Sequence, residues 1–293
     1  MCSVGEILSL GGDDRLTLNE NKINKYYAST YPRSNVVSRG CCTCSTVSQE
    51  SFDSACIANR ISDARSVVDE NGREELYSSE FEVIRDRISA VLRLNEIEAS
   101  SDVVLFPSGS DAELMTTSVA LVKQFSVSAK TDCPILNLVV AAGEVGSGTA
   151  NAASGLHFSD ISPTNMTQKK DKCVDGLLPT DVELCLFKPR SVEGSSLQLQ
   201  QYEDAIEAKL TEAITKNPNR VCLLHVVCGS KTGLVYPSLQ FAKAMTARHP
   251  DNLLVVVDCC QLRCHYSYIH QCIGSGFMCL ITGSKFFTGP PFW

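Results

Sequence analysis

The sequence predicts a three-layer α/β fold, in which helices cover both faces of a mostly parallel β-sheet. Short apolar runs rich in β-branched residues alternate with segments of helical periodicity. Strands of this kind are typical of parallel sheets that are buried on both faces. Small, hydroxylic or ionisable residues follow five of the runs. Sheets of this class bind ligands beyond the carboxyl ends of their strands, so these residues predict a binding site there.

The first quarter of the chain has a different pattern. Residues 1–74 are polar and rich in turn formers, so we expect an N-terminal arm that packs on the rest of the chain. Residues 75–293 form the main domain, and apolar residues at helical spacing predict that it opens with a helix over 75–94. The expected strands are 102–106, 135–142, 183–187, 221–227, 253–258 and 277–282, with helices at 111–125, 200–216 and 238–248.

Composition and charge argue against several classes of function. The chain has 293 residues, a formal net charge of −7 and no basic run, which is unlike a protein that binds nucleic acid or an anionic membrane. No apolar stretch approaches the ~20 residues that a transmembrane helix needs. The start lacks the basic region of a signal peptide. We therefore expect a cytoplasmic protein with no membrane or nucleic-acid partner.

The chain contains fifteen cysteines. A disulfide scaffold is not expected, because such scaffolds are short secreted chains. Most of the cysteines lie inside apolar runs, where a thiol behaves as a small buried hydrophobe. CCTC (41–44) and CCQLRC (259–264) have ligands that zinc accepts, but neither holds two C-x-x-C pairs. We therefore expect no metal site.

The stretch PSGSDAE (107–113) leads from an expected strand into an expected helix. Gly109 permits a tight turn, and the hydroxyls of Ser108 and Ser110 together with free helix amides would hold a phosphate. An ordinary helix cap, made by Ser or Asp, explains the same residues. The stretch is neither a Walker A loop nor G-x-G-x-x-G, which argues against ATP and dinucleotides.

Two ionisable residues stand at the ends of apolar strands. Asp258 needs a partner for its carboxylate, either the protonated ring nitrogen of a cofactor or the amides of a following helix. Gln261 lies three residues further on, where it could donate to a ring hydroxyl. Lys285 either extends its amine to solvent or is poised for Schiff-base chemistry. Thr282 and Ser284 offer further hydroxyls for a phosphate.

VVVDCCQ (255–261) and ITGSKFFTGPP (281–291) together resemble the pyridoxal-phosphate enzymes of fold type I, and among them the class V aminotransferase and cysteine desulfurase group. The resemblance covers about residues 75–293 and implies the large domain of that fold. It implies pyridoxal 5′-phosphate as cofactor, an amino acid substrate, transferase or lyase chemistry, and a homodimer. Lys285 would form the Schiff base, Asp258 would pair with the ring nitrogen, and Gln261 would contact the ring hydroxyl. The implied phosphate ligands are Ser108, Gly109, Ser110, Thr282 and Ser284.

The sequence departs from this family in three places. The aromatic or histidine residue that stacks on the cofactor ring is not evident where Glu144, Ser147 and Thr149 stand, although His157 is a candidate. Ser284 occupies the position of the family's histidine. The family continues past the lysine into a small C-terminal domain, which we do not expect in a chain that reaches only Trp293.

Two other functions remain open from the residues. A truncated, non-catalytic relative would retain the fold and bind cofactor or a partner subunit without turnover. A hydrolase would use Cys228 or Ser147 with His225 or His157, but the sequence lacks the G-x-S-x-G motif and a placed acid.

Overall fold

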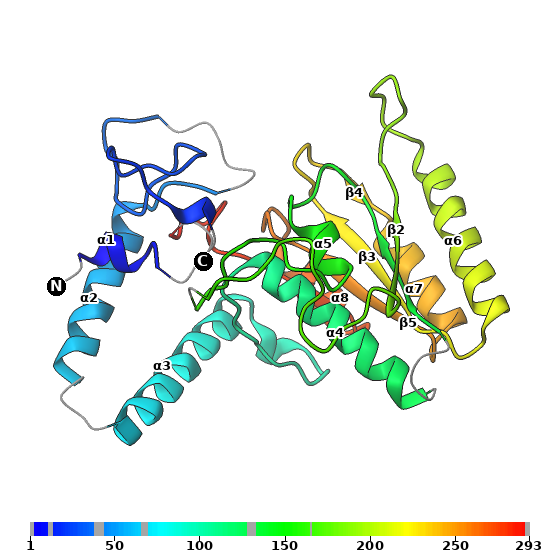
Figure 1. The fold of residues 1–293 in the computed structure, drawn as a ribbon, viewed down its shortest axis with the longest axis horizontal. Coiled ribbons are helices and arrows are strands. Elements are labelled where there is room, and N and C mark those ends of the chain that lie inside the picture. Colours follow the sequence, from blue (N-terminus) through cyan, green and yellow to red (C-terminus); the bar gives the residue numbers. More distant parts are fainter. Residues whose placement is uncertain are drawn as a thin grey trace.

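The computed structural model describes residues 3–10, 14–37, 44–65, 70–127, 133–164 and 166–290. Five parallel strands lie in the order β2-β1-β3-β5-β6, and the short strand β4 pairs with β3 in the antiparallel direction. Figure 1 shows this sheet edge-on between layers of helix. The strands are β1 (Ile135–Val139), β2 (Val182–Leu186), β3 (Cys222–Cys228), β4 (Val235–Tyr236), β5 (Leu253–Asp258) and β6 (Met278–Leu280).

Helices pack on both faces of the sheet, which confirms the predicted fold class. One face carries α6 (Leu199–Lys216), α7 (Leu239–Arg248) and α8 (Tyr266–Ile273), whose apolar side chains join the larger buried core. The opposite face carries α4 (Gly109–Val127), which buries Ala120 and Leu121 against β1, β3 and β5. The short helix α5 (Thr149–Ala153) packs beside α4. None of the described helices is both long enough and apolar enough to cross a membrane.

The alternation of side chains along β5 decides which residues face the site. Val256 belongs to the core beneath α4, whereas Val255 and Val257 belong to the core beneath α6, α7 and α8. Successive side chains of a strand point to opposite faces. Asp258 therefore lies on the α4 face, and Cys259 lies on the other.

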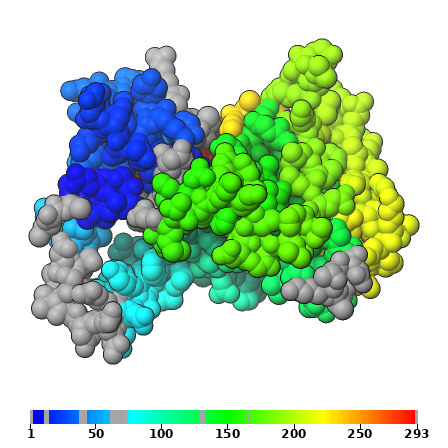
Figure 2. All heavy atoms as spheres, viewed as in Figure 1, coloured from blue at the N-terminus to red at the C-terminus, as the bar shows by residue number. Residues whose placement is uncertain are grey.

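The N-terminal part is more helical than the sequence indicated. It contains α1 (Val4–Ile7), α2 (Gln49–Arg65), α3 (Glu70–Val91) and two 3₁₀ helices, Asp14–Leu16 and Leu94–Glu96. The expected helix over 75–94 corresponds to α3, which begins five residues earlier. Figures 1 and 2 show these residues as a lobe beside the sheet.

A run of backbone contacts joins this lobe to the segment after β6. The amide of Ser45 donates to the carbonyl of Ser284 at 3.0 Å, and the amide of Ser48 donates to the carbonyl of Thr288 at 2.9 Å. The hydroxyl of Ser45 donates to the carbonyl of Lys285 at 2.8 Å. The N-terminal arm thus packs on the segment that carries the predicted Schiff-base lysine.

Three sequence expectations differ from the structure or fall outside it. Residues 102–106 form no strand; they are extended without a paired neighbour, and Val104 is 63% exposed. The first quarter of the chain was expected to be irregular, which is wrong for α2. Cys41, Cys42 and Trp293 lie outside the described residues.

Candidate functional site

A cavity of about 600 Å³ opens at the carboxyl ends of β3, β5 and β6 and at the start of α4. Its size lies within the range of small-molecule and cofactor sites. The structure brings all eight residues predicted from the sequence to its wall: Ser108, Gly109, Ser110, Asp258, Gln261, Thr282, Ser284 and Lys285. The lobe formed by the N-terminal part also lines the cavity, through Arg15, Tyr26 and Arg87.

The first turn of α4 forms one wall of this cavity. The hydroxyl of Ser108 donates to Asp111 Oδ2 at 2.6 Å and accepts from the Asp111 amide at 3.3 Å, so Ser108 does cap the helix. Ser110 is buried and lies where a Cβ on Gly148 would come within 2.6 Å of its hydroxyl oxygen. A side chain at 148 would require the hydroxyl of Ser110 to move, because the loop after β1 approaches the start of α4 closely.

The end of β5 forms the floor of the cavity. Asp258 Oδ1 accepts a hydrogen bond from the backbone amide of Cys260 at 2.9 Å. The next helix, α8, begins only at Tyr266, so Asp258 stabilises a tight turn rather than a helix start. Gln261 is buried beside it and lines the cavity.

The segment after β6 forms the opposite wall. Lys285 is partly exposed, and the buried side chain of Ser284 lies next to it. The hydroxyls of Thr282 and Ser284 lie 2.9 Å apart, and Thr282 Oγ1 also accepts from the Ser284 amide at 3.2 Å. These bonds hold both hydroxyls in a fixed turn at the cavity wall.

A buried pair beneath the floor was not predicted from the sequence. Glu113 of α4 lies at the cavity wall, and its Oε1 atom is 3.2 Å from His225 Nε2 on β3. His225 Nε2 also lies 2.9 Å from Asn137 Oδ1, so a neutral imidazole donates there. Glu113 Oε1 itself is buried without a hydrogen-bond partner in the described structure. His225 lies on the α4 side of β3, whereas Cys228 belongs to the core on the other side. Cys228 and His225 therefore do not form the nucleophile–histidine pair of a hydrolase.

Burial disfavours the charged form of both members of this pair. Desolvation, followed by the nearby negative charge of Asp258, raises the pKa of Glu113 well above its usual range. Desolvation also lowers the pKa of His225 to about 3.

The signal for Glu113 was present in the helical spacing. In α4, Glu113 shares a buried stripe with Thr117, Ala120 and Gln124, at intervals of three and four residues. Residues 107–113 were predicted to form a phosphate loop, and Glu113 was therefore not assigned to the buried stripe. A buried carboxyl group at the wall of a cavity has a perturbed pKa, and such groups are common at functional sites.

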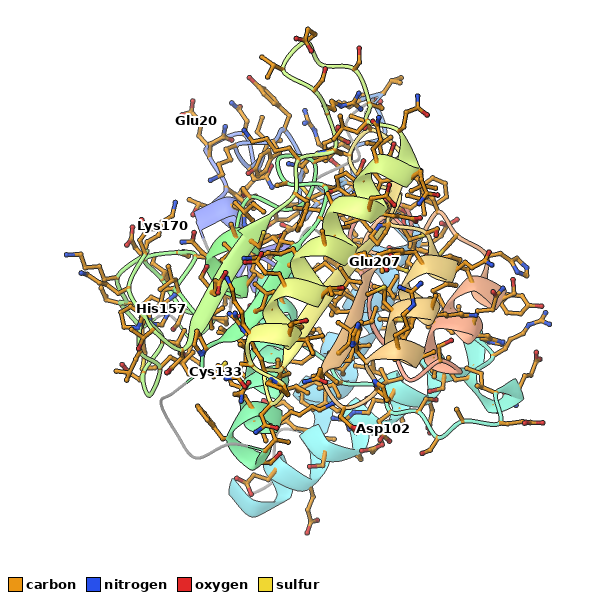
Figure 3. All side chains as sticks on the ribbon, turned by 90° about the vertical axis from the view of Figure 1, so that its right-hand side faces the viewer. Glu20, Asp102, Cys133, His157, Lys170 and Glu207 are labelled. Carbon is orange, nitrogen blue, oxygen red and sulfur yellow. The ribbon has the colours of Figure 1, made fainter. Side chains whose placement is uncertain are left out.

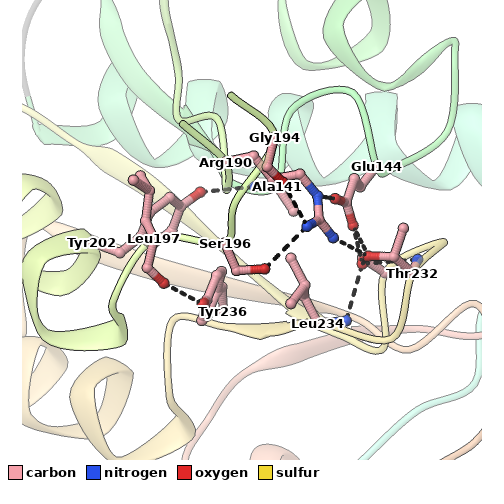
Figure 4. Close-up of polar contacts among 11 residues, drawn as sticks. Ala141, Glu144, Arg190, Gly194, Ser196, Leu197, Tyr202, Thr232, Leu234 and Tyr236 are labelled. Carbon is pink, nitrogen blue, oxygen red and sulfur yellow. Dashed lines mark hydrogen bonds and ion pairs between the residues drawn. The ribbon is translucent and has the colours of Figure 1, made fainter. Parts of the chain in front are cut away.

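The residues expected near the ring-stacking position have different roles in the structure. Glu144 lines the cavity, but its Oε1 accepts from Arg190 Nε at 2.5 Å, and its Oε2 accepts from the hydroxyls of Ser230 and Thr232 (Figure 4). These bonds outweigh the raising effect of burial and lower the pKa of Glu144. Glu144 therefore ties together the loops that follow β1, β2 and β3.

The remaining candidates for ring stacking divide into two groups. Ser147 and Thr149 line the cavity, and so does the apolar side chain of Val145 between them and Glu144. His157 is not among the described residues that form the cavity wall. It lies in an outer loop, where its amide donates to the carbonyl of Lys172 at 2.8 Å (Figure 3).

No protein-family model and no curated protein matches the sequence. Among solved structures, mouse CSAD aligns with 86% of this chain and 47% of its own, at 13% identity and a TM-score of 0.51. The chain therefore shares the α/β fold of mouse CSAD. It spans about half the length of the mouse CSAD chain, at 47%. An S-selective transaminase from Arthrobacter sp. also aligns, over 59% of this chain and 36% of its own, at 15% identity and a TM-score of 0.31.

Proposed function

We propose that the chain is a pyridoxal-phosphate-dependent enzyme that acts on an amino acid, with Lys285 as the covalent attachment point of the cofactor. The observation that carries this proposal is the convergence of Lys285, Asp258 and Gln261 on one cavity at the carboxyl edge of the sheet. The overall fold supports it, since mouse CSAD shares that fold.

The chemistry of the cavity wall fits this cofactor. The start of α4 supplies Gly109 and the buried hydroxyl of Ser110, and the loop after β6 supplies Thr282 and Ser284. Hydroxyls and helix amides are good partners for a phosphate. Glu113 Oε1 is an orphaned buried polar atom at the same wall, which a bound polar group would satisfy.

Each residue has a defined task in this proposal. Asp258 balances the positive charge of the ring nitrogen, and Gln261 donates to the ring hydroxyl. Bound pyridoxal phosphate supplies an electron sink for negative charge at the Cα of an amino acid. Lys285 moves the proton at that carbon. It lines the cavity and takes part in none of the ion pairs found among the described residues.

The lobe formed by the N-terminal part supplies a place for the substrate carboxylate. Arg15 and Arg87 line the cavity. Guanidinium groups bind carboxylates with two parallel hydrogen bonds, so we assign the carboxylate of the substrate to these arginines.

We also propose the family group, the oligomeric state and the location of the protein. We place the chain in the class V group, in a homodimer and in the cytoplasm. Exposed apolar side chains along α3, namely Tyr77, Phe81 and Ile84, offer a surface that a second subunit would cover. The non-catalytic alternative is an outcome of the experiment below.

The test is covalent trapping of the cofactor. Purified protein is incubated with pyridoxal phosphate, scanned for a visible absorption band, reduced with borohydride and digested for peptide mass analysis. We expect the band and a pyridoxyl group on Lys285. Lys285→Ala should lose both while its circular dichroism is unchanged.

Lys231→Ala is the matched control, because Lys231 lines the same cavity and has no role in the proposal. It should retain the band and the labelled Lys285 peptide. Labelling of another lysine, or an unchanged spectrum in Lys285→Ala, would contradict the assignment. A folded protein that gives no band would favour the non-catalytic relative.

A further inference from the structure

Three thiols meet on the face of the sheet opposite the cavity. The Sγ atoms of Cys228, Cys259 and Cys264 all lie within 4.8 Å of one another. Cys228 ends β3, and Cys259 follows the last residue of β5. The parallel register pairs Val227 with Asp258, which places the two following cysteines side by side.

The loop after β5 brings the third thiol to the other two. The amide of Leu262 donates to the carbonyl of Cys259 at 2.8 Å, and Leu262 adopts a positive φ of 45°. A residue other than glycine rarely adopts this conformation, and it costs energy unless the surroundings compensate. The turn reverses the chain, so Cys264 returns to Cys259 instead of continuing towards solvent.

A second feature of this cluster is the hydroxyl of Tyr268. It is buried and has no hydrogen-bond partner in the described structure. Tyr268 packs against the same core as Cys228, Cys259 and Cys264. A buried phenol is normally hydrogen-bonded, so the cluster contains a polar group that lacks its partner.

We propose that Cys228, Cys259 and Cys264 bind one thiophilic d¹⁰ metal ion of the Zn²⁺ class. Thiolate sulfur is the ligand that such ions prefer, and their Sγ atoms are already gathered before any ion is present. Three protein ligands leave the fourth position of a tetrahedral ion open to a further ligand. Two of the ligands, Cys228 and Cys259, are buried, which protects the site from competing ligands.

The cysteines that the sequence places together are not those that the structure brings together. Cys260 lies in the run CCQLRC but lines the cavity on the other face, because its neighbour Cys259 points away from it. Cys228 completes the cluster from a separate strand. A motif search limited to one stretch of sequence therefore does not find the site.

The place of the cluster in the fold gives it a structural role. Cys259 follows Asp258 directly, and Cys228 lies on the adjacent strand. An ion held by both would fix two neighbouring strand ends from behind the floor of the cavity. The inference does not depend on the proposed cofactor, since its test uses the metal alone.

The experiment is a titration of the metal-free, fully reduced protein with Cd²⁺, followed by the ultraviolet charge-transfer absorption of thiolate bound to the ion. A phosphine reductant avoids added thiols. We expect saturation at one equivalent, with an absorption change that corresponds to three thiolates. Zn²⁺ added afterwards should compete for the same site.

Cys264→Ser tests the assignment, because Cys264 is partly exposed in a loop and its replacement leaves the sheet intact. This variant should bind Cd²⁺ at least tenfold more weakly. Cys185→Ser is the matched control, a partly buried cysteine on β2 outside the cluster, and should bind like the parent. Binding by Cys264→Ser that is as tight as the parent's, or the absence of a stoichiometric charge-transfer band, would show that the thiols only pack the core.

Discussion

The buried histidine beneath the cavity, His225, should make the free energy of unfolding depend on pH. Desolvation by burial lowers the pKa of His225 in the folded state to about 3, below the ~6.5 of an exposed histidine. A group with a lowered pKa adds stability above its unfolded pKa, and that stability is lost as the pH falls towards the folded value. We therefore expect the unfolding free energy to drop between about pH 6.5 and pH 4 partly because His225 must become charged.

The variant His225→Gln isolates this contribution. Gln keeps an amide donor for Asn137 and cannot be protonated in this pH range. As the pH falls through this window, the unfolding free energy of the parent should therefore drop relative to that of the variant by on the order of 1 kcal/mol or more for each pH unit. Urea unfolding at several pH values measures it. His157→Gln, outside the cavity, should follow the parent, and parallel curves for parent and His225→Gln would contradict the prediction.

The location of individual residues at the cavity was predictable where a polar or ionisable residue follows an apolar strand. Asp258, Gln261 and Lys285 stand just past apolar strands, and the edge of a parallel sheet gathers such positions. Ser108 shows the limit of this reasoning, because a helix cap and a phosphate ligand need the same hydroxyl. Glu113 was missed because a charged residue near the start of a helix normally faces solvent.

At the scale of elements, strands and helices with a strong apolar pattern were predicted well. The helices at 200–216 and 238–248 correspond closely to α6 and α7. The expected strand 102–106 was wrong because its apolar residues line the cavity and find no neighbouring strand. The helix α2 was missed because it is polar on all sides and shows no apolar stripe.

The contact between the arm and the lysine segment gives a second prediction. The hydroxyl of Ser45 donates to the carbonyl of Lys285. Its loss in Ser45→Ala should cost about 1 kcal/mol of interaction, because the carbonyl of Lys285 then keeps only the amide of Thr288 as a donor. If that bond holds Lys285 in position, pyridoxal phosphate should bind about fivefold more weakly, as measured by titration of the visible band.

Ser126→Ala is the control for this change. Its hydroxyl donates to the carbonyl of Lys123 within α4, far along the helix from the cavity wall. The control should bind the cofactor like the parent. Equal affinity in all three proteins would mean that the arm does not position the lysine.

At the scale of the whole molecule, the sheet separates two chemical environments. The face under α4 carries the cavity with Asp258, and the face under α6, α7 and α8 carries the thiol cluster. The pattern of single strands predicts this division, since neighbouring residues point to opposite faces. The grouping of Cys228 with Cys259 and Cys264 could not be predicted, because it depends on strand order and on the turn at Leu262.

The two faces meet at the bond between Asp258 and Cys259, and this predicts coupling between metal and cofactor. A bound ion would restrict the end of β5, so Asp258 would lose less freedom when the cofactor binds. We expect Cd²⁺ to tighten the binding of pyridoxal phosphate about fivefold, a coupling of about 1 kcal/mol. Because coupling is reciprocal, the cofactor must tighten Cd²⁺ binding by the same factor. Both affinities are measured by titration, each with and without the other ligand. Cys264→Ser is the control, because it removes one metal ligand and leaves the cavity wall unchanged. This variant should bind the cofactor equally with and without Cd²⁺. Identical cofactor affinities in the metal-free and metal-bound parent would show that the two faces act independently.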